Sequence, residues 1–199
     1  MGRMTTDLTL QQTLTVLGAL AALADQVDEQ AAGSPTPCSD FDVAALTGHV
    51  VGWLEAFAAG YASPDGQCPP LPTATVPVAE AGPRVRAAAQ RLGDAVRAGA
   101  AERPLRVGDD AMPGDLALSM ILAEYLVHGW DLAVATGQSW QPDPDTCQTS
   151  RDFLTGMVTP ESRGSGWFGP EVPVPADASP LHRLLGFCGR DPHWVAPTS

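Results

Sequence analysis

Apolar residues recur every three or four positions along much of this chain, which is the spacing of a helix that buries one face. In the first such segment the apolar positions are Leu10, Leu14, Leu17, Ala21, Ala24 and Val27. Gly33 and the proline-containing segment 34–37 end this pattern, because a proline cannot continue a helix. The sequence therefore predicts a long first helix that packs against the rest of the protein.

Glycines, prolines and capping residues divide the remainder of the chain into helical segments in the same way. We expect helices over about 39–60, 85–99, 113–137, 143–158 and 179–189, and proline-rich loops over 62–78 and 159–178. Ser39 stands three residues before Asp42, which resembles a capping box, while Asp143 and Ser179 each precede a proline at the first helical position. No segment shows the alternation typical of a strand. The pattern predicts an all-α protein.

The size of the chain predicts one domain. With 199 residues, of which 44% are apolar, the chain can bury a single substantial core. We expect one domain over 1–199, made of a four-helix bundle over about 6–158 and a short helical, proline-rich C-terminal extension over about 159–199.

Composition excludes several functions. A net charge of −12 repels phosphate backbones and anionic lipid surfaces, so we expect neither nucleic acid nor a membrane as a partner. Arginine supplies all eleven basic residues, and both lysine and asparagine are absent. Without lysine there is no Schiff-base or lysine-anchored pyridoxal chemistry, and without asparagine there is no Cys-His-Asn triad.

Cysteine usage and hydropathy indicate the compartment. Cys38, Cys68, Cys147 and Cys188 form no Cys-x-x-Cys pair, which favours free thiols in a reducing environment. The N-terminal segment lacks the apolar stretch of a signal peptide, and no apolar run approaches 18 residues. We expect a cytoplasmic protein.

A pair of metal-ligating residue types lies within the segment that reads as the most buried helix. Glu124 and His128 are four residues apart and so share one helix face, with Asp131 three residues further on. Their sequence neighbours are almost all apolar, so we expect the Glu124 carboxylate to be buried, where it needs a partner. His49 lies in the middle of a second apolar helix.

Two interpretations of these residues remain open from the residues alone. Glu124 and His128 can grip one divalent ion from the same side of the helix, with further ligands from elsewhere. Alternatively, each histidine is a hydrogen-bonded core residue, and the Glu124–His128 pair is an ordinary pairing between adjacent turns of a helix.

Several motifs together resemble one family. They are Pro35–Val43 followed by Leu46 and His49, Glu124–Ala133 with Ala135–Gln138, and in the tail Phe168–Pro175, Ser179–Pro180 and Gly189–Pro192. In these segments the chain resembles the actinobacterial DinB-like metal-binding proteins related to the mycothiol-dependent maleylpyruvate isomerase N-terminal domain. The resemblance covers essentially the whole chain.

The resemblance implies a fold and a ligand set. It implies a DinB-like four-helix bundle that holds one divalent ion, usually zinc, through His49, Glu124 and His128. Two histidines and one carboxylate leave a coordination position open, as in catalytic zinc sites, and the same set also suits iron(II) or nickel. The resemblance further implies mycothiol as a cosubstrate, whose thiolate adds to an unsaturated small molecule. The short proline-rich tail differs from the isomerase C-terminal domain, so maleylpyruvate itself is not implied.

Three further residues are candidates for the site. Asp131, one turn beyond His128, is a candidate catalytic residue. Three roles are open for it: it accepts the N–H of a ligand imidazole, it carries protons, or it is merely a solvated acid at a helix end. Trp53 and Trp130 are candidates for binding the cosubstrate as walls of a cleft, with core packing as the alternative for both. Cys38, eleven residues before His49, would lie roughly 16 Å away along a helix, too far to be activated by the site.

These observations predict a divalent-metal dependent enzyme, with zinc as the expected ion. It uses a low-molecular-weight thiol such as mycothiol for transfer to, or isomerisation of, an electrophilic small molecule. Two alternatives remain: a metal-assisted hydrolase that activates water, and a metal-binding bundle without turnover. The expected partners are a small-molecule substrate and a thiol, and the sequence leaves open whether two copies form a homodimer.

Overall fold

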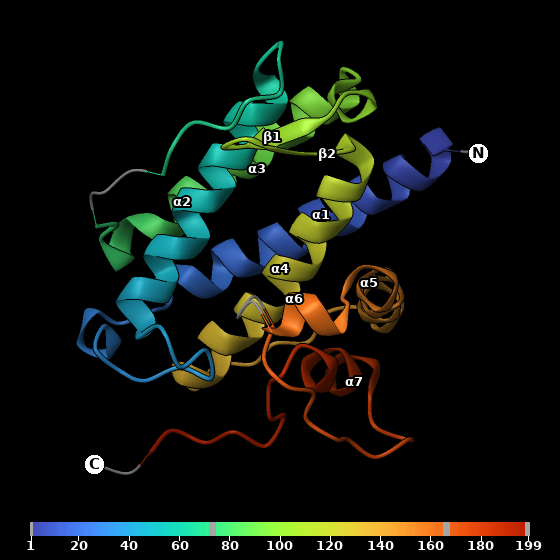
Figure 1. Ribbon diagram of the computed structural model, residues 1–199. Coiled ribbons are helices and arrows are strands. Elements are labelled where there is room, and N and C mark those ends of the chain that lie inside the picture. Colours follow the sequence, from blue (N-terminus) through green and yellow to red (C-terminus); the bar gives the residue numbers. More distant parts are fainter. Residues whose placement is uncertain (1, 72–74, 165–167, 198–199) are drawn as a thin grey trace.

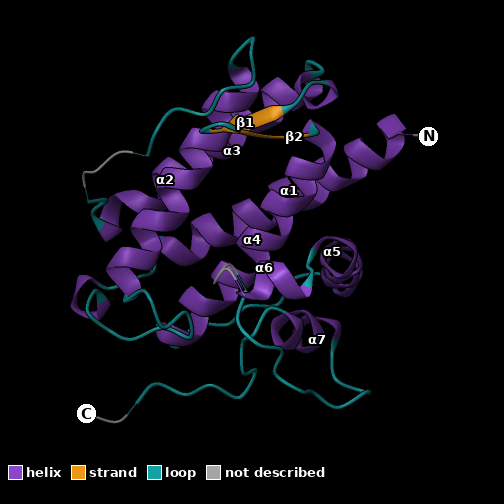
Figure 2. Cartoon of the chain, viewed as in Figure 1, coloured by secondary structure: helices purple, strands orange, loops and turns teal. Residues whose placement is uncertain are grey.

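The computed structural model describes residues 2–71, 75–164 and 168–197, and helices dominate it (Figures 1 and 2). The helices are α1 (Gly2–Ala24), α2 (Val43–Ala62), α3 (Val78–Arg97), α4 (Gly114–Ala135), α5 (Pro144–Met157), α6 (Pro160–Gly164) and α7 (Pro180–Phe187), with 3-10 turns at Glu29–Ala31 and Ala100–Glu102. The strands are β1 (Leu105–Val107) and β2 (Asp110–Met112). The predicted all-α class and DinB-like four-helix bundle are confirmed.

Helices α1 to α4 form the bundle. α1 packs against α3 and α4, and α2 packs against the same two helices, so the order around the bundle is α1, α3, α2, α4. Leu17 of α1, Leu54 of α2, Leu92 of α3 and Leu118 of α4 are all completely buried in the shared core. The apolar stripes recognised in the sequence thus face one another across a single interior.

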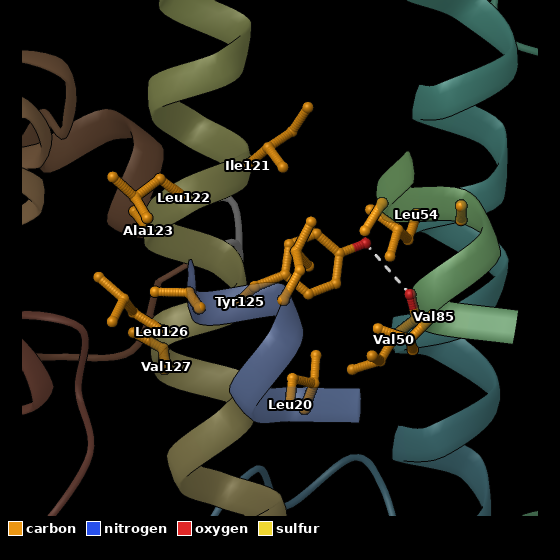
Figure 3. Close-up of a cluster of buried hydrophobic side chains, with 14 of the residues drawn as sticks. Leu20, Val50, Leu54, Val85, Ile121, Leu122, Ala123, Tyr125, Leu126 and Val127 are labelled. Carbon is orange, nitrogen blue, oxygen red and sulfur yellow. Dashed lines mark hydrogen bonds between the residues drawn. The ribbon is translucent and has the colours of Figure 1, made fainter. Parts of the chain in front are cut away.

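Two tyrosines fix how α2 and α4 lie against each other. The buried Tyr61 hydroxyl donates a hydrogen bond to the Gly114 carbonyl at 2.6 Å, and the buried Tyr125 hydroxyl donates to the Val50 carbonyl at 3.1 Å (Figure 3). The end of α2 therefore lies beside the start of α4, so the two helices run antiparallel. Val50 and Tyr125 are the chain neighbours of His49 and Glu124, which brings these two side chains into the same layer of the bundle.

Most helix boundaries follow the predicted capping signals. Asp143 and Ser179 are the N-caps of α5 and α7, and their side chains accept hydrogen bonds from the backbone N–H groups of Thr146 and His182. The start of α2 was predicted wrongly. Its N-cap is Asp42, whose carboxylate accepts from the backbone N–H of Ala45, so Ser39 lies outside the helix.

The structure contains elements that the sequence did not predict. β1 and β2 pair antiparallel, with Gly108 in the connecting turn at a φ of +58°; at three residues each, they are too short to show alternation. α3 begins at Val78, earlier than expected, and α6 lies within the predicted loop 159–178. Of the two predicted loops, residues 72–74 and 165–167 lie outside the described residues.

The helices that follow α4 gather on one side of it. α5 packs against α4 and α7 packs against α5, so these helices gather on the same side of the bundle (Figure 1). This placement brings the chain after α7 back to the C-terminal half of α4.

Two bundle helices are apolar enough to be compared with membrane spans. α2 and α4 each reach a mean hydropathy of 1.2 over a window long enough to cross a bilayer, although polar residues interrupt both helices. However, 56% and 78% of the residues in these windows are buried inside the protein. Their apolar side chains are accounted for by the core of the bundle.

Gly129 of α4 is required by close packing. A Cβ atom at this position would overlap the ring of Trp140, which lies across α4 and donates its indole N–H to the Leu126 carbonyl at 3.1 Å. Trp140 follows α4 in the chain and is buried in the core. The helix surface next to His128 is therefore fixed by an aromatic ring that leaves no space for a side chain.

We expect Gly129→Ala to destabilise the protein by about 1–3 kcal/mol, because overpacking outweighs the higher helix propensity of alanine. Gly18→Ala in α1 is the matched control. Apart from the adjacent helix backbone, no described atom lies within 4 Å of its added Cβ, so we expect it to stabilise by about 0.5–1 kcal/mol. Urea denaturation of both variants measures the change in unfolding free energy. Equal changes would show that the Trp140 ring moves aside without loss of stability.

Candidate metal centre

The structure brings His49, Glu124 and His128 together. One ligand atom from each residue lies within 4.8 Å of the others, although His49 comes from α2 and the other two from α4. Nε2 of His49 lies 3.1 Å from Oε1 of Glu124, and Nε2 of His128 lies 3.2 Å from the same oxygen. The i, i+4 spacing on α4 and the antiparallel pairing with α2 together account for this convergence.

The arrangement offers two nitrogen atoms and one oxygen atom to a common point. The imidazole rings of His49 and His128 meet edge to face, with centroids 5.1 Å apart and an interplanar angle of 74°. Both rings therefore direct Nε2 toward the Glu124 carboxylate. Imidazole nitrogen and carboxylate oxygen are donors that zinc and other first-row divalent metals accept, so the donor set fits such an ion.

Glu124 is less buried than expected. Its side chain retains 37% of its exposure, whereas the side chain of His49 retains 23% and that of His128 only 9%. The carboxylate is therefore reached from solvent on one side. Burial acts to raise the pKa of the Glu124 carboxyl, but hydrogen bonds from His128 and His49 hold it well below its usual range. Glu124 is an ionised acceptor at neutral pH.

A second carboxylate holds His128 from behind. Nδ1 of His128 donates to Oδ2 of Asp131 at 3.0 Å, since an ionised carboxylate can only accept. Burial acts to lower the pKa of His128, but its hydrogen bonds with Asp131 and Glu124 raise it to about 9. In the absence of a metal, His128 is thus an imidazolium between two carboxylates.

Asp131 is completely buried, so it is not a solvated acid at a helix end. Its carboxylate also accepts hydrogen bonds from Arg190, whose Nε lies 3.0 Å from Oδ1 and whose Nη2 lies 3.0 Å from Oδ2. This geometry agrees with the first of the three alternatives, in which Asp131 accepts the N–H of a ligand imidazole.

Arg190 belongs to this cluster, although the sequence did not predict it. It lies 59 residues after Asp131, and no periodicity connects the two. The only available signal was its place in the tail segment Gly189–Pro192, one of the segments that carried the family resemblance.

The two candidate tryptophans differ in their surroundings. Trp130 is 5% exposed and belongs to the core, which favours the packing alternative. Trp53 is half-buried one turn beyond His49 and stacks on Phe57, with ring centroids 5.3 Å apart. The Phe41 ring packs against His49, with ring centroids 4.9 Å apart. Trp53 and Phe41 are thus partly buried aromatic side chains near His49 in the described part of the chain.

The expectation that Cys38 is remote from the site is wrong. Its Sγ, a nitrogen of His128 and a carboxylate oxygen of Asp131 all lie within 4.8 Å of one another. The helical distance estimate fails because α2 begins only at Val43 and the chain before it turns back, with the Phe41 N–H donating to the Cys38 carbonyl at 2.9 Å.

The surroundings of Cys38 oppose ionisation of its thiol. Burial raises the pKa of Cys38, and the Asp131 charge adds to this effect, while Arg190 acts in the opposite direction. All four cysteines are free, as predicted, and Cys38 is the one that is only half-buried.

Because the pKa of His128 is raised on folding, its contribution to stability is complete below about pH 6.5 and is lost as the pH rises through about 9. We expect the unfolding free energy of the metal-free protein to fall over this interval, by at most about 3 kcal/mol. His128→Gln should remove most of this slope, and His193→Gln, at an exposed histidine of the tail, should retain it. Urea denaturation in the presence of a chelator measures the effect, and an unchanged slope in His128→Gln would contradict it.

Comparison with known proteins identifies the family. Residues 14–133 match the mycothiol maleylpyruvate isomerase N-terminal domain family. Two relatives from Mycobacterium tuberculosis, uncharacterized protein MT0763 of strain CDC 1551 / Oshkosh and uncharacterized protein Rv0738 of strain H37Rv, are each 34% identical over 173 residues, which span 86% of this chain and 92% of the relative. No solved structure matches the chain significantly. The matched region contains His49, Glu124, His128 and Asp131, and the chain belongs to the mycothiol maleylpyruvate isomerase N-terminal domain family.

Proposed function

We propose that this protein is a divalent-metal dependent enzyme, with zinc as the expected ion, that uses a low-molecular-weight thiol such as mycothiol. The reaction is transfer of the thiol to an electrophilic small molecule, or isomerisation of that molecule. The observation that carries the proposal is the convergence of His49 Nε2, His128 Nε2 and Glu124 Oε1 within 4.8 Å in a member of this family.

The ligand roles follow from the donor atoms. His49, Glu124 and His128 would hold the ion, and three protein ligands leave a position for a small molecule. A divalent cation bound there would lower the pKa of a coordinated thiol, so that the thiolate forms at neutral pH. Asp131, which is buried, acts on the reaction only by holding the His128 ring. Trp53 is the proposed contact for the cosubstrate, and Trp130 supports α4 from the core.

Few side chains of this protein are suited to act as the nucleophile. Lysine is absent, and the Cys38 thiol is kept protonated by its surroundings. An incoming thiol is therefore the better nucleophile, although Cys38 is close enough to His128 to require a direct test. The absence of lysine also removes Schiff-base catalysis by a lysine side chain.

Two alternatives use the same ligand set. Two depressions of about 470 and 500 Å³ lie beside α1, the end of α3 and the start of α4, away from the proposed ligands, and so do not distinguish between the alternatives. A metal-binding bundle that acts without catalysis, or a hydrolase that activates water at the open position, would use the same ligands.

Replacing His49, Glu124 or His128 by alanine should each remove most of the bound metal, because a centre with three protein ligands has no redundancy. Metal content is measured by elemental analysis after purification without added metal, and again after loading with Zn²⁺ and removal of the excess. His193→Ala is the matched control and should retain wild-type metal. Near-stoichiometric metal in all three ligand variants would refute the ligand set.

Turnover assays on the zinc-loaded protein separate the three functions. Activity that requires mycothiol supports the proposal, whereas hydrolysis in buffer without any thiol supports the hydrolase. Zinc binding with no turnover of electrophilic substrates in either assay supports the bundle without catalysis.

Cys38→Ala should leave metal content and thiol-dependent activity nearly unchanged, because the raised pKa of Cys38 keeps its thiol protonated at neutral pH. Removal of the metal by a chelator should abolish the activity in both proteins. An inactive Cys38→Ala variant with full metal occupancy and an unchanged circular dichroism spectrum would contradict this mechanism. It would show that the nucleophile is the Cys38 thiol and not an external thiol.

A further inference from the structure

The chain after α7 is turned toward α4 by a glycine. Gly189 has a φ of +81°, a conformation that favours glycine, and the backbone N–H groups of Gly189 and Arg190 donate to the carbonyls of Gly186 and Leu185. An added Cβ on Gly189 would come within 2.9 Å of the Gly169 backbone, so the turn is also packed against the preceding loop. This turn sets the direction in which the Arg190 side chain leaves the backbone.

Arg190 meets Asp131 with its guanidinium fork. Nε and Nη2 both donate to the carboxylate, each with a shortest distance of 3.0 Å, while the arginine side chain is 16% exposed and that of Asp131 is fully buried. Such a paired contact fixes the plane of the carboxylate, which a single point charge does not. The same oxygen, Oδ2, accepts from both Arg190 Nη2 and His128 Nδ1.

These contacts form one continuous connection from the tail to the proposed ligands. Arg190 holds Asp131, Asp131 accepts from Nδ1 of His128, and Nε2 of the same ring lies 3.2 Å from Glu124. Hydrogen-bond partners behind a ligand imidazole fix its tautomer and orientation, and their loss typically weakens metal binding about 10–100-fold. Arg190 lies outside residues 14–133, the region that matches the family.

We infer that Arg190 is a positioning residue for the metal centre, so that the C-terminal extension completes a site whose ligands all lie in the bundle. The inference rests on the proposed function, because it requires that His128, which Arg190 positions through Asp131, is a metal ligand. Arg190 acts through Asp131, to which both of its donor nitrogens are directed. A merely structural Arg190–Asp131 pair would stabilise the fold and leave metal affinity unchanged.

The experiment compares Arg190→Gln with Arg183→Gln. Arg183 is a second arginine of the extension that donates to Gln148 at 3.0 Å and does not contact Asp131. The dissociation constant for Zn²⁺ is measured by competition with a chromophoric chelator, and the visible spectrum of the Co²⁺-loaded protein reports the ligand geometry. We expect Arg190→Gln to weaken Zn²⁺ binding about 10–100-fold and to alter the Co²⁺ spectrum. Arg190→Lys should recover part of the affinity, and Arg183→Gln should match the wild type.

A second readout needs no metal. In the metal-free protein, ¹H–¹⁵N NMR of the histidine rings should show the His128 Nδ1–H held in its hydrogen bond, assigned with His128→Gln. We expect this resonance to shift or broaden in Arg190→Gln and to stay unchanged in Arg183→Gln. If the wild-type protein binds no metal, the proposed function fails, and the resonance still decides whether Arg190 positions His128.

Folding of the variant is controlled by a neutral pair. Arg190→Gln removes one of the two cations that hold the buried Asp131 carboxylate. Loss of one partner of a buried ion pair typically costs about 3–5 kcal/mol, which is enough to unfold a marginal domain. The double variant Asp131→Asn with Arg190→Gln avoids an unpaired buried charge, and we expect it to fold and to bind Zn²⁺ more weakly than the wild type. Wild-type affinity together with an unchanged His128 resonance in folded Arg190→Gln, or wild-type affinity in the double variant, would overturn the inference.

Discussion

A buried carboxylate, that of Asp131, connects the bundle, the extension and the candidate site. It has no access to solvent, and it is neutralised from two sides by the His128 imidazolium and the Arg190 guanidinium. An uncompensated charge in that position would cost several kcal/mol, a large part of the 5–15 kcal/mol that stabilises a typical domain. The position of the extension and the orientation of His128 therefore depend on the same side chain.

Around this ion pair, the precision of the site comes from ordinary core packing. The Tyr125 hydroxyl joins α4 to the Val50 carbonyl of α2 among fully buried aliphatic side chains (Figure 3), so that His49 cannot slide along α4. The Trp140 ring packs on α4 at Gly129, the residue that follows His128. The ligand atoms thus project from a packed layer of side chains toward the partly exposed face where Glu124 lies, and such packing holds donor atoms in place.

Much of this arrangement follows from the sequence. The 3.6-residue periodicity predicts all four bundle helices, and the i, i+4 spacing predicts that Glu124 and His128 share a face. The pairing of His49 with Glu124, 75 residues apart, came from the family resemblance, because spacing carries no information between separate helices.

The remaining features depend on tertiary contacts. β1, β2 and α6 are too short to produce a periodic signal, and the position of Cys38 depends on where the chain turns before Asp42. The pairing of Arg190 with Asp131 requires the path of α5 to α7 over α4, which no local pattern contains. The assignment of the metal ligands themselves stays a prediction.

The separation of 59 residues between Asp131 and Arg190 has a consequence for biosynthesis. At the usual 5–20 residues per second, about 3–12 s pass between the synthesis of α4 and the addition of its neutralising arginine. During that interval the nascent bundle can bury its leucines but cannot bury Asp131 with its guanidinium partner. The order of synthesis thus delays the final closure of this end of the bundle until the extension has emerged from the ribosome.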